Sequence, residues 1–345
     1  MATVAAILFL VSASLICSCN EGRKIGEEEK AQNRTCVRIT SPLTGLPLKD
    51  SSSAARRAVA VKVENQADAR PQSGLDLAEL VYEEIVEGSI TRFIAIYLDN
   101  EASEMGPVRS ARPMDVNILA PINPLLVLSG GSPVVMQTLE RSKVYFITED
   151  NESYFWRARD RRAPHNLYTS TALVRSALKD WNIETFQWKE DLFRFGEPGA
   201  YATVTALNVD YPGPYKVGYQ YDAASGRYLR SQAGQPMTDK KSGQPIAPTT
   251  VIIQYVELED TGVKDMAGSL SPDAVVVGSG EALVFTAGKV FYGTWEKAAS
   301  SDRTVYRDEN GEEITIRPGQ VWIHLIPKAI RVEYQIAATS EKPQK

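Results

Sequence analysis

Two arginines stand three residues apart in the segment GPVRSARPMD, which spans residues 106–115. Arg109 and Arg112 carry like charges, so the pattern needs either an anion between them or a separate acidic partner for each. Guanidinium groups bind phosphate and carboxylate through two parallel hydrogen bonds and stay charged at physiological pH. The segment therefore predicts an anion-binding site or, alternatively, two structural ion pairs.

Other polar residues that could complete an anion site stand near turns in the first half of the sequence. We expect the ligand to contact Arg70, Arg92, Arg109, Arg112, His165 and Asn166. We expect three further side chains to orient them, namely Asn65, Glu83 and Asp115. A glycine-rich turn at 129–133, followed by a helix over 133–142, would add backbone N–H donors. The expected ligand carries a phosphate, a pyrophosphate or a carboxylate.

The structural alternative rests on acids that lie close to these arginines in the sequence. The candidate partners are Glu64, Glu83, Glu84, Glu87 and Asp115. A second arginine group, RARDRR at 157–162, is typical of a solvated charged loop. His165 follows this group, and it could serve as an acid or base, or could anchor the loop through a hydrogen bond.

The sequence contains none of the common catalytic motifs GxSxG, GxGxxG and HExxH, and no P-loop. Its three cysteines, Cys17, Cys19 and Cys36, all lie near the N-terminus, which excludes a cysteine nucleophile, a disulfide framework and a CxxC metal site in the main body. We expect no cofactor and no metal, although a carboxylate site for Mg²⁺ or Ca²⁺ stays open. A binding role is favoured over an enzyme.

Composition and length indicate a folded protein with two domains. The chain has 345 residues, of which 43% are apolar, enough for a sizeable core. The net charge of −5 gives no reason to expect nucleic acid as a partner.

The N-terminus has the character of a secretion signal. Residues 4–19 carry no charge and suit a signal-peptide core, since a membrane-spanning helix needs about 20 apolar residues. Ser18 precedes Cys19 as in a bacterial lipobox, so we expect residues 1–19 to be the signal and Cys19 to be lipidated. A non-cleaved hydrophobic anchor is the alternative. Residues 20–54 are expected to form a flexible tether, which places the protein outside the cytoplasm on the cell membrane.

Hydrophobic periodicity predicts an α/β (or α+β) first domain over 55–195 and a mostly-β second domain over 205–337. In the first domain, strands are expected over 58–65, 89–99 and 123–133, and helices over 133–142 and 169–182, the last capped by Thr169 or Ser170. Residues 77–88 predict a short helix followed by a strand. In the second domain, short strands separated by glycine, asparagine and proline predict an all-β structure.

Long segments of the sequence resemble the YerB-type lipoproteins, the DUF3048 family. In the first half these are VKVENQADARPQSGLDLAELVYEEIVEGSITRFIAIY, GPVRSARPMD, LSGGSP and APHNLYT, and in the second half YDAASGRYLRSQAGQPMTD, VVVGSGEALVFTAGKVFYGTWEK and NGEEITIRPGQVWIHLIP. The resemblance covers roughly residues 40–337 and departs where the family commonly has His and this chain has Met237. It implies a bacterial, membrane-anchored, extracytoplasmic protein with two domains, and it implies no reaction.

Three functions fit these observations. The first is an envelope lipoprotein that binds an anionic envelope ligand, including peptidoglycan-related ones, through an arginine pocket. The second is a phosphotransferase or hydrolase acting on lipid-linked or cell-wall glycans, because the arginine turn beside an acid is similar in style to the LytR-CpsA-Psr enzymes. The third is a scaffold lipoprotein with a protein partner. The membrane, through the lipid anchor, is a partner in all three.

Overall fold

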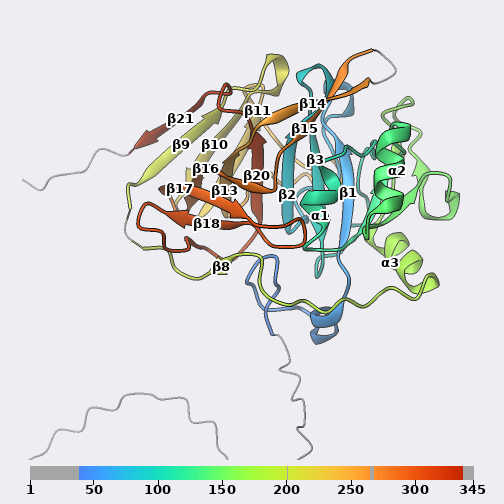
Figure 1. Cartoon of the computed structure of the whole chain (residues 1–345), viewed down its shortest axis with the longest axis horizontal. Coiled ribbons are helices and arrows are strands. Elements are labelled where there is room, and N and C mark those ends of the chain that lie inside the picture. Colours follow the sequence, from blue (N-terminus) through green and yellow to red (C-terminus); the bar gives the residue numbers. More distant parts are fainter. Residues whose placement is uncertain (1–38, 200, 265–267, 337–345) are drawn as a thin grey trace, which may run out of the picture. The chain divides into compact units, whose positions relative to one another are not determined.

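The computed structural model describes residues 39–199, 201–264 and 268–336 (Figure 1). The predicted signal peptide, the lipidation site Cys19 and residues 20–38 of the predicted tether lie outside these described residues. No helix in the described ranges is both long and apolar enough to cross a membrane.

A large mixed sheet forms the centre of the fold. Its ten strands are β1 (Val59–Glu64), β2 (Leu80–Ile85), β3 (Thr91–Tyr97), β4 (Leu125–Leu128), β5 (Tyr145–Thr148), β13 (Thr250–Tyr255), β16 (Gly278–Thr286), β17 (Lys289–Lys297), β18 (Val305–Asp308) and β20 (Val321–Ile326). They lie side by side in the order β18-β17-β16-β13-β20-β2-β3-β1-β4-β5. Alternating β-branched and apolar residues, as in AVAVKVEN, make these segments strands.

A second sheet of five strands packs on this one. Its strands are β9 (Val204–Val209), β10 (Val217–Asp222), β11 (Arg227–Gln232), β12 (Gln235–Pro236) and β21 (Val332–Ile336). Three two-stranded pairs complete the β structure: β14 (Leu258–Lys264) with β15 (Leu270–Ala274), β8 (Arg194–Phe195) with β19 (Thr315–Ile316), and β6 (Trp156–Arg157) with β7 (Leu167–Tyr168). The predicted fold class, helices and strands followed by a mostly-β half, is confirmed.

The helices are few and short. They are α1 (Asp115–Leu119), α2 (Pro133–Arg141) and α3 (Thr171–Asp180), with 3-10 turns at Ser51–Ala55, Ala67–Ala69, Glu87–Ser89, Glu152–Tyr154 and Gly213–Tyr215. The side chain of Ser132 caps α2, and the side chain of Ser170 caps α3, as one of the two predicted caps. The short helix expected at the start of 77–88 does not form. The Glu79 carboxylate there accepts backbone N–H bonds from Asp99 and Asn100, which holds the segment in an extended course.

The two predicted domains share the central sheet. Strand β20 from the second half lies between β2 of the first half and β13 of the second, parallel to both. Helices α1 and α2 cover one face, where the side chains of Ala60, Ile94 and Ile323 are buried. Helix α3 and the five-stranded sheet cover the other face. The boundary between the halves in sequence is therefore not a boundary in the core.

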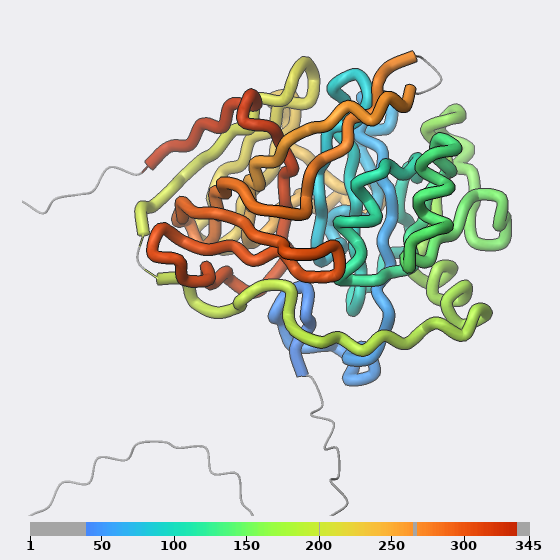
Figure 2. Tube along the Cα trace, viewed as in Figure 1, coloured from blue at the N-terminus to red at the C-terminus, as the bar shows by residue number. Residues whose placement is uncertain are grey.

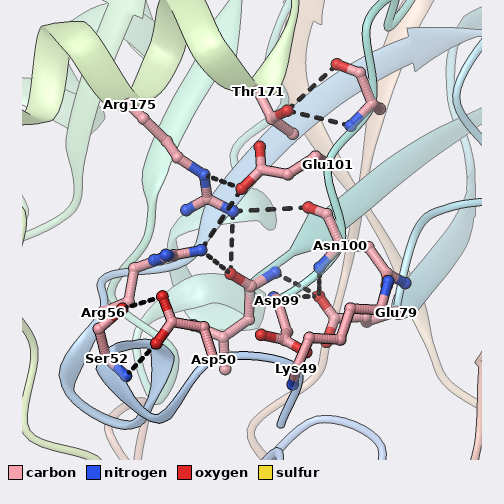
Figure 3. Close-up of polar contacts among 12 residues, drawn as sticks. Lys49, Asp50, Ser52, Arg56, Glu79, Asp99, Asn100, Glu101, Thr171 and Arg175 are labelled. Carbon is pink, nitrogen blue, oxygen red and sulfur yellow. Dashed lines mark hydrogen bonds and ion pairs between the residues drawn. The ribbon is translucent and has the colours of Figure 1, made fainter.

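Residues 39–54 differ from the prediction of a flexible tether, because they pack on the folded body. Leu43 and Ser53 are fully buried. The backbone N–H of Lys49 donates to Asp99 Oδ2 at 2.8 Å, and its ammonium donates to Asn100 at 2.6 Å (Figure 3). Nearby, Glu101 pairs with Arg56, which follows the first 3-10 turn, and at 2.8 Å with Arg175 of α3. Any tether can include only residues before this segment.

Two connecting segments matter for the surface (Figure 2). Residues 181–196 run from α3 to β8 along one edge of the body, and the hairpin β14–β15 stands at the opposite edge. We call the first segment the strap. Its Phe186 N–H donates to Ala55 O at 2.8 Å and its Trp188 Nε1 donates to Arg56 O at 3.1 Å, which fixes it to the N-terminal segment.

Candidate functional site

Strand direction brings the predicted site residues to one edge of the central sheet. Strands β1, β4 and β5 are mutually parallel, and β2, β20 and β13 are mutually parallel. Strand β3 is antiparallel to both β1 and β2, so β1 and β2 run in the same direction. The six strands other than β3 are therefore all parallel, and their carboxyl ends lie along one edge of the sheet. At β1 the strand order changes direction, because β3 lies on one side of β1 and β4 on the other. In open α/β sheets this is where ligands bind.

Arg109 and Arg112 each have their own acidic partner. Arg109 Nη2 lies 2.5 Å from Glu64 Oε1, and Arg112 Nη2 pairs with Glu87 Oε2. Glu64 ends β1 and Glu87 follows β2, so the acids come from the strand ends and the arginines from the loop before α1. Burial raises the pKa of Glu87, but the hydrogen bond and charge of Arg112 hold it below its ordinary value. The two guanidinium groups are therefore neutralised separately.

His165 joins Arg109 at the same carboxylate. Its Nδ1 lies 3.0 Å from both oxygens of Glu64, and 3.4 Å from Arg109 Nη2. Two acceptor oxygens at Nδ1 require the proton on that nitrogen, so the neutral ring presents Nε2 as its basic atom. The Glu64 side chain is only 2% exposed, whereas His165 is 20% exposed. The contact with Glu64 therefore holds and orients the imidazole ring of His165.

Two other predicted residues, Arg70 and Asn65, brace loops. Arg70 donates to the carbonyl of Asn65 at 2.8 Å and to Pro214 O at 3.0 Å, and its guanidinium lies over the ring of Tyr215. Asn65 donates to Thr91 Oγ1 at 2.6 Å. These contacts join the loop after β1 to the five-stranded sheet.

Asn166, predicted as a ligand neighbour, serves its own loop. Its side-chain oxygen accepts from Arg157 at 2.9 Å, and its amide donates to Ala158 O at 3.2 Å. Arg161 of the RARDRR segment donates to Pro71 O at 2.5 Å, so this segment is anchored to the loop after β1 rather than being a freely solvated loop.

Arg92 lies in the middle of this edge, on β3. It stands in register with Glu64 of β1 and Glu84 of β2, and its Nη1 donates to Ser110 O at 2.8 Å. Burial, together with the nearby charge of Arg112, lowers the pKa of Arg92 to about 10. The predicted placement of Arg92 beside the arginine turn agrees with its position in the structure.

Asp115 and Glu83, predicted to orient the arginines, have different surroundings. Asp115 accepts a hydrogen bond from the backbone N–H of Arg112 at 2.9 Å and forms an ion pair with Lys62 at 2.9 Å. It therefore supports the arginine turn, as predicted. Glu83 does not, because alternate residues of a strand face opposite sides of the sheet. It faces Arg230 of β11 at 2.7 Å, under the five-stranded sheet.

Beside Arg112 the edge is hollowed into a cleft of about 560 Å³. The walls are the turn between β4 and α2, the first residues of α2, and the hairpin β14–β15, and the lining residues are Glu87, Ser110, Arg112, Ser129, Gly130, Gly131, Ser132, Pro133, Val135, Val263, Lys264 and Ser271. Gly130 has a φ of +81°, which favours glycine at this turn. We call this space the edge cleft. Arg109 and His165 do not line it, so the predicted set divides between two places.

The sequence-based reading missed two lysines. Lys62 is fully buried on β1, where it pairs with Glu84 and Asp115. A lysine within the otherwise apolar strand AVAVKVEN could have indicated a buried ion pair. Lys264 reaches the edge cleft from the hairpin, and nothing local in the sequence indicates this. No cluster of His, Cys, Asp and Glu able to hold a metal ion occurs among the described residues.

The buried triad of Lys62, Glu84 and Asp115 should make stability depend on pH. Burial and the adjacent Asp115 raise the pKa of Glu84 to about 7. The folded state therefore keeps a proton that the unfolded chain releases, so stability falls as pH rises from the ordinary glutamate range to about 7. In Glu84→Gln this loss should be absent. The free energy of unfolding of the variant, relative to that of the parent, should therefore rise by about 3 kcal/mol as the pH increases from about 4 to about 8. Urea unfolding at several pH values measures it, and a difference that stays constant with pH would contradict the assignment.

The comparisons with known proteins define the class of this chain. Residues 43–184 match the N-terminal domain, and residues 207–323 the C-terminal domain, of a protein family of unknown function, DUF3048. The chain belongs to this family. It is 31% identical over 331 residues to "Putative lipoprotein YerB" of Bacillus subtilis (strain 168), covering 94% of this chain and 95% of that protein. The crystal structure of YerB from Bacillus subtilis matches with a TM-score of 0.76 at 31% identity, over 86% of this chain and all of that one.

Proposed function

We propose that this protein is an extracytoplasmic lipoprotein, held on the membrane by a lipid on Cys19, and that its folded part binds an anionic envelope ligand in the edge cleft. The proposed membrane anchor is supported by the uncharged segment 4–19, which ends at Cys19, and by the name of the Bacillus subtilis relative. The ligand carries a phosphate, a pyrophosphate or a carboxylate.

The observation that carries the proposal is the set of donors lining the edge cleft. Among the described residues, none accepts a hydrogen bond from the backbone N–H of Gly131 or Ser132, which both line the edge cleft. These groups belong to the turn and to the N-cap of α2, where the helix dipole favours an anion. Lys264 adds a positive charge from the opposite wall.

Arg112 gives the edge cleft a second, independent feature of an anion site. The residue is 7% exposed, and its Nε has no hydrogen-bond partner in the described part of the chain. A buried guanidinium N–H without an acceptor is costly, so an acceptor from a ligand would stabilise it. A bound anion would share Arg112 with Glu87.

We expect a ligand of the edge cleft to raise the thermal unfolding midpoint of the full chain. Suitable probes are phosphate, pyrophosphate, undecaprenyl-phosphate analogues and muropeptides, each with and without Mg²⁺. A ligand that binds only the folded state contributes about 2.7 kcal/mol at a hundredfold excess over its dissociation constant. The shift caused by phosphate, pyrophosphate or muropeptides should disappear in Lys264→Gln combined with the paired change Glu87→Gln and Arg112→Gln, which removes the cations without leaving an acid unpaired.

The matched control is Lys328→Gln, an exposed lysine paired with Glu281 away from the edge cleft. It should keep the full shift. If no anion raises the midpoint of the parent protein, the proposal fails. In that case the separate neutralisation of Arg109 by Glu64 and of Arg112 by Glu87 favours the scaffold function, and protein partners become the target. Release of a product from a lipid-linked or cell-wall glycan would instead support the transferase or hydrolase.

A further inference from the structure

A second cleft, of about 660 Å³, lies at the other end of the parallel strands of the central sheet from the edge cleft. Its walls are the end of α1, the connection from α2 to β5, the strap and the turn after β17. The strand β5 begins here, so this is the edge of the amino ends of the parallel strands. We call it the strap cleft. Nothing in the proposed function involves it.

The floor of the strap cleft is apolar and aromatic. It is formed by Val116, Pro121, Val144, Phe186, Trp188 and Leu192. The rings of Phe186 and Trp188 meet edge to face, with centroids 5.1 Å apart. Because Trp188 Nε1 already donates to Arg56 O at 3.1 Å, the indole has no free hydrogen-bond donor for a ligand. The floor therefore suits a hydrocarbon and offers little to a polar molecule.

The rim of the strap cleft is basic. Arg141, Lys143 and Lys189 line it and are exposed, and no acid in the described ranges forms an ion pair with any of them. The fourth cation, Arg303, is held by Glu190 at 2.8 Å and by Glu313 at 2.6 Å. Glu190 is the one acid that lines the strap cleft within the described residues, and Arg303 already engages it.

A buried arginine adds positive charge below the floor. Arg57 is 7% exposed, and it donates only to backbone carbonyls, at 2.7 Å to Ile183 O and 2.6 Å to Asn123 O. Its guanidinium lies 5.5 Å from the ring centroid of Phe186, which forms part of the floor. Carbonyl dipoles do not cancel a full charge, so the positive potential of Arg57 extends toward the strap cleft.

We propose that the strap cleft binds an amphiphilic anion, a molecule with a long acyl or isoprenyl chain and a phosphate or carboxylate head group. The chain would lie on the aromatic floor, and the head group would pair with Lys143, Lys189 and Arg141. Exposed cations alone are ordinary solvated surface. Here they surround an apolar cleft whose lining acid, Glu190, is already paired with Arg303. This charge complementarity selects an anion, and the floor selects a hydrocarbon.

Isothermal titration of the full chain with dodecyl phosphate, below its micelle concentration, tests the proposal. We expect saturable binding, with weaker binding of neutral dodecyl maltoside and none of inorganic phosphate at this site. Lys143→Gln combined with Lys189→Gln should weaken dodecyl phosphate about tenfold and leave dodecyl maltoside unchanged. Lys216→Gln with Lys328→Gln, two lysines exposed elsewhere, is the matched control and should bind as the parent does.

A second variant tests the apolar part of the strap cleft. Ala120 lines the cleft and is half-buried at the end of α1, so Ala120→Phe fills space without removing a core side chain. It should abolish dodecyl phosphate binding while circular dichroism shows an unchanged fold. Equal binding of dodecyl phosphate and dodecyl maltoside, or unchanged binding in both variants, would overturn the proposal. The Lys264 variant of the edge cleft should not affect this binding, which separates the two sites.

Discussion

Replacing Lys62 by methionine should lower the free energy of unfolding by about 3–5 kcal/mol at about pH 8. Lys62 is fully buried and is the counter-ion of two carboxylates, pairing with Glu84 and lying 2.9 Å from Asp115 Oδ1. Both acids have fully buried side chains, so without the ammonium they would face each other in the core, where the weaker attraction of Arg92 compensates only in part. Urea unfolding of the variant and the parent measures the loss.

The pH and a second substitution show whether charge causes this loss. Near pH 5 the loss in Lys62→Met should shrink, because Glu84 can then take up a proton and relieve the repulsion. Adding Glu84→Gln should restore part of the stability at about pH 8, since only one buried acid then remains ionised. A loss below about 1 kcal/mol at both pH values would show that water reaches the triad.

Replacing Arg230 by methionine should have an effect of similar size, about 3–5 kcal/mol, for a different reason. Arg230 of β11 is the counter-ion of Glu83 on β2, with Nη2 at 2.7 Å from Oε2, and both side chains are completely buried. Burial alone would raise the pKa of Glu83, but the charge and the hydrogen bond of Arg230 hold it below its ordinary value. The pair therefore joins the five-stranded sheet to the first half of the chain.

The neighbours of this pair make the result informative. Burial lowers the pKa of His324 to about 4, so the ring is neutral and cannot replace Arg230 as counter-ion. Its two nitrogens are satisfied by the hydroxyls of Tyr211 at 3.0 Å and Tyr219 at 2.9 Å. In Arg230→Met the pKa of Glu83 should rise, so the variant should regain stability as pH falls. The double variant with Glu83→Gln should lose clearly less than Arg230→Met, and equal losses would refute the ion-pair explanation.

Local features of the sequence predicted the parts of the site that depend on local structure. The turn Ser129–Pro133 and the helix after it follow from a buried strand, two glycines and a serine cap, and they lie where the sequence indicated. The arginine turn was also recognised, together with the alternative that each arginine has its own acid. That alternative describes Arg109 with Glu64 and Arg112 with Glu87.

Other parts of the site depend on pairings that no local pattern encodes. Glu83 and Glu84 are neighbours in YEEI, and a shift of one residue in register would exchange their faces. Arg230 lies 147 residues from Glu83 in the chain. The Arg230 side chain contacts Glu83 only because the five-stranded sheet packs over β2. The hairpin that brings Lys264 to the edge cleft is placed by the same long-range packing.

The position of β20 sets how late in synthesis the core of this protein can be completed. Strand β20, Val321–Ile326, supplies the hydrogen bonds for one edge of β2 and one edge of β13. Until it emerges, an apolar strand made more than two hundred residues earlier remains with an open edge, which is a template for aggregation. The chain therefore cannot finish its core one half at a time. Protection of the open edges from aggregation must therefore last until nearly the last strand has been made.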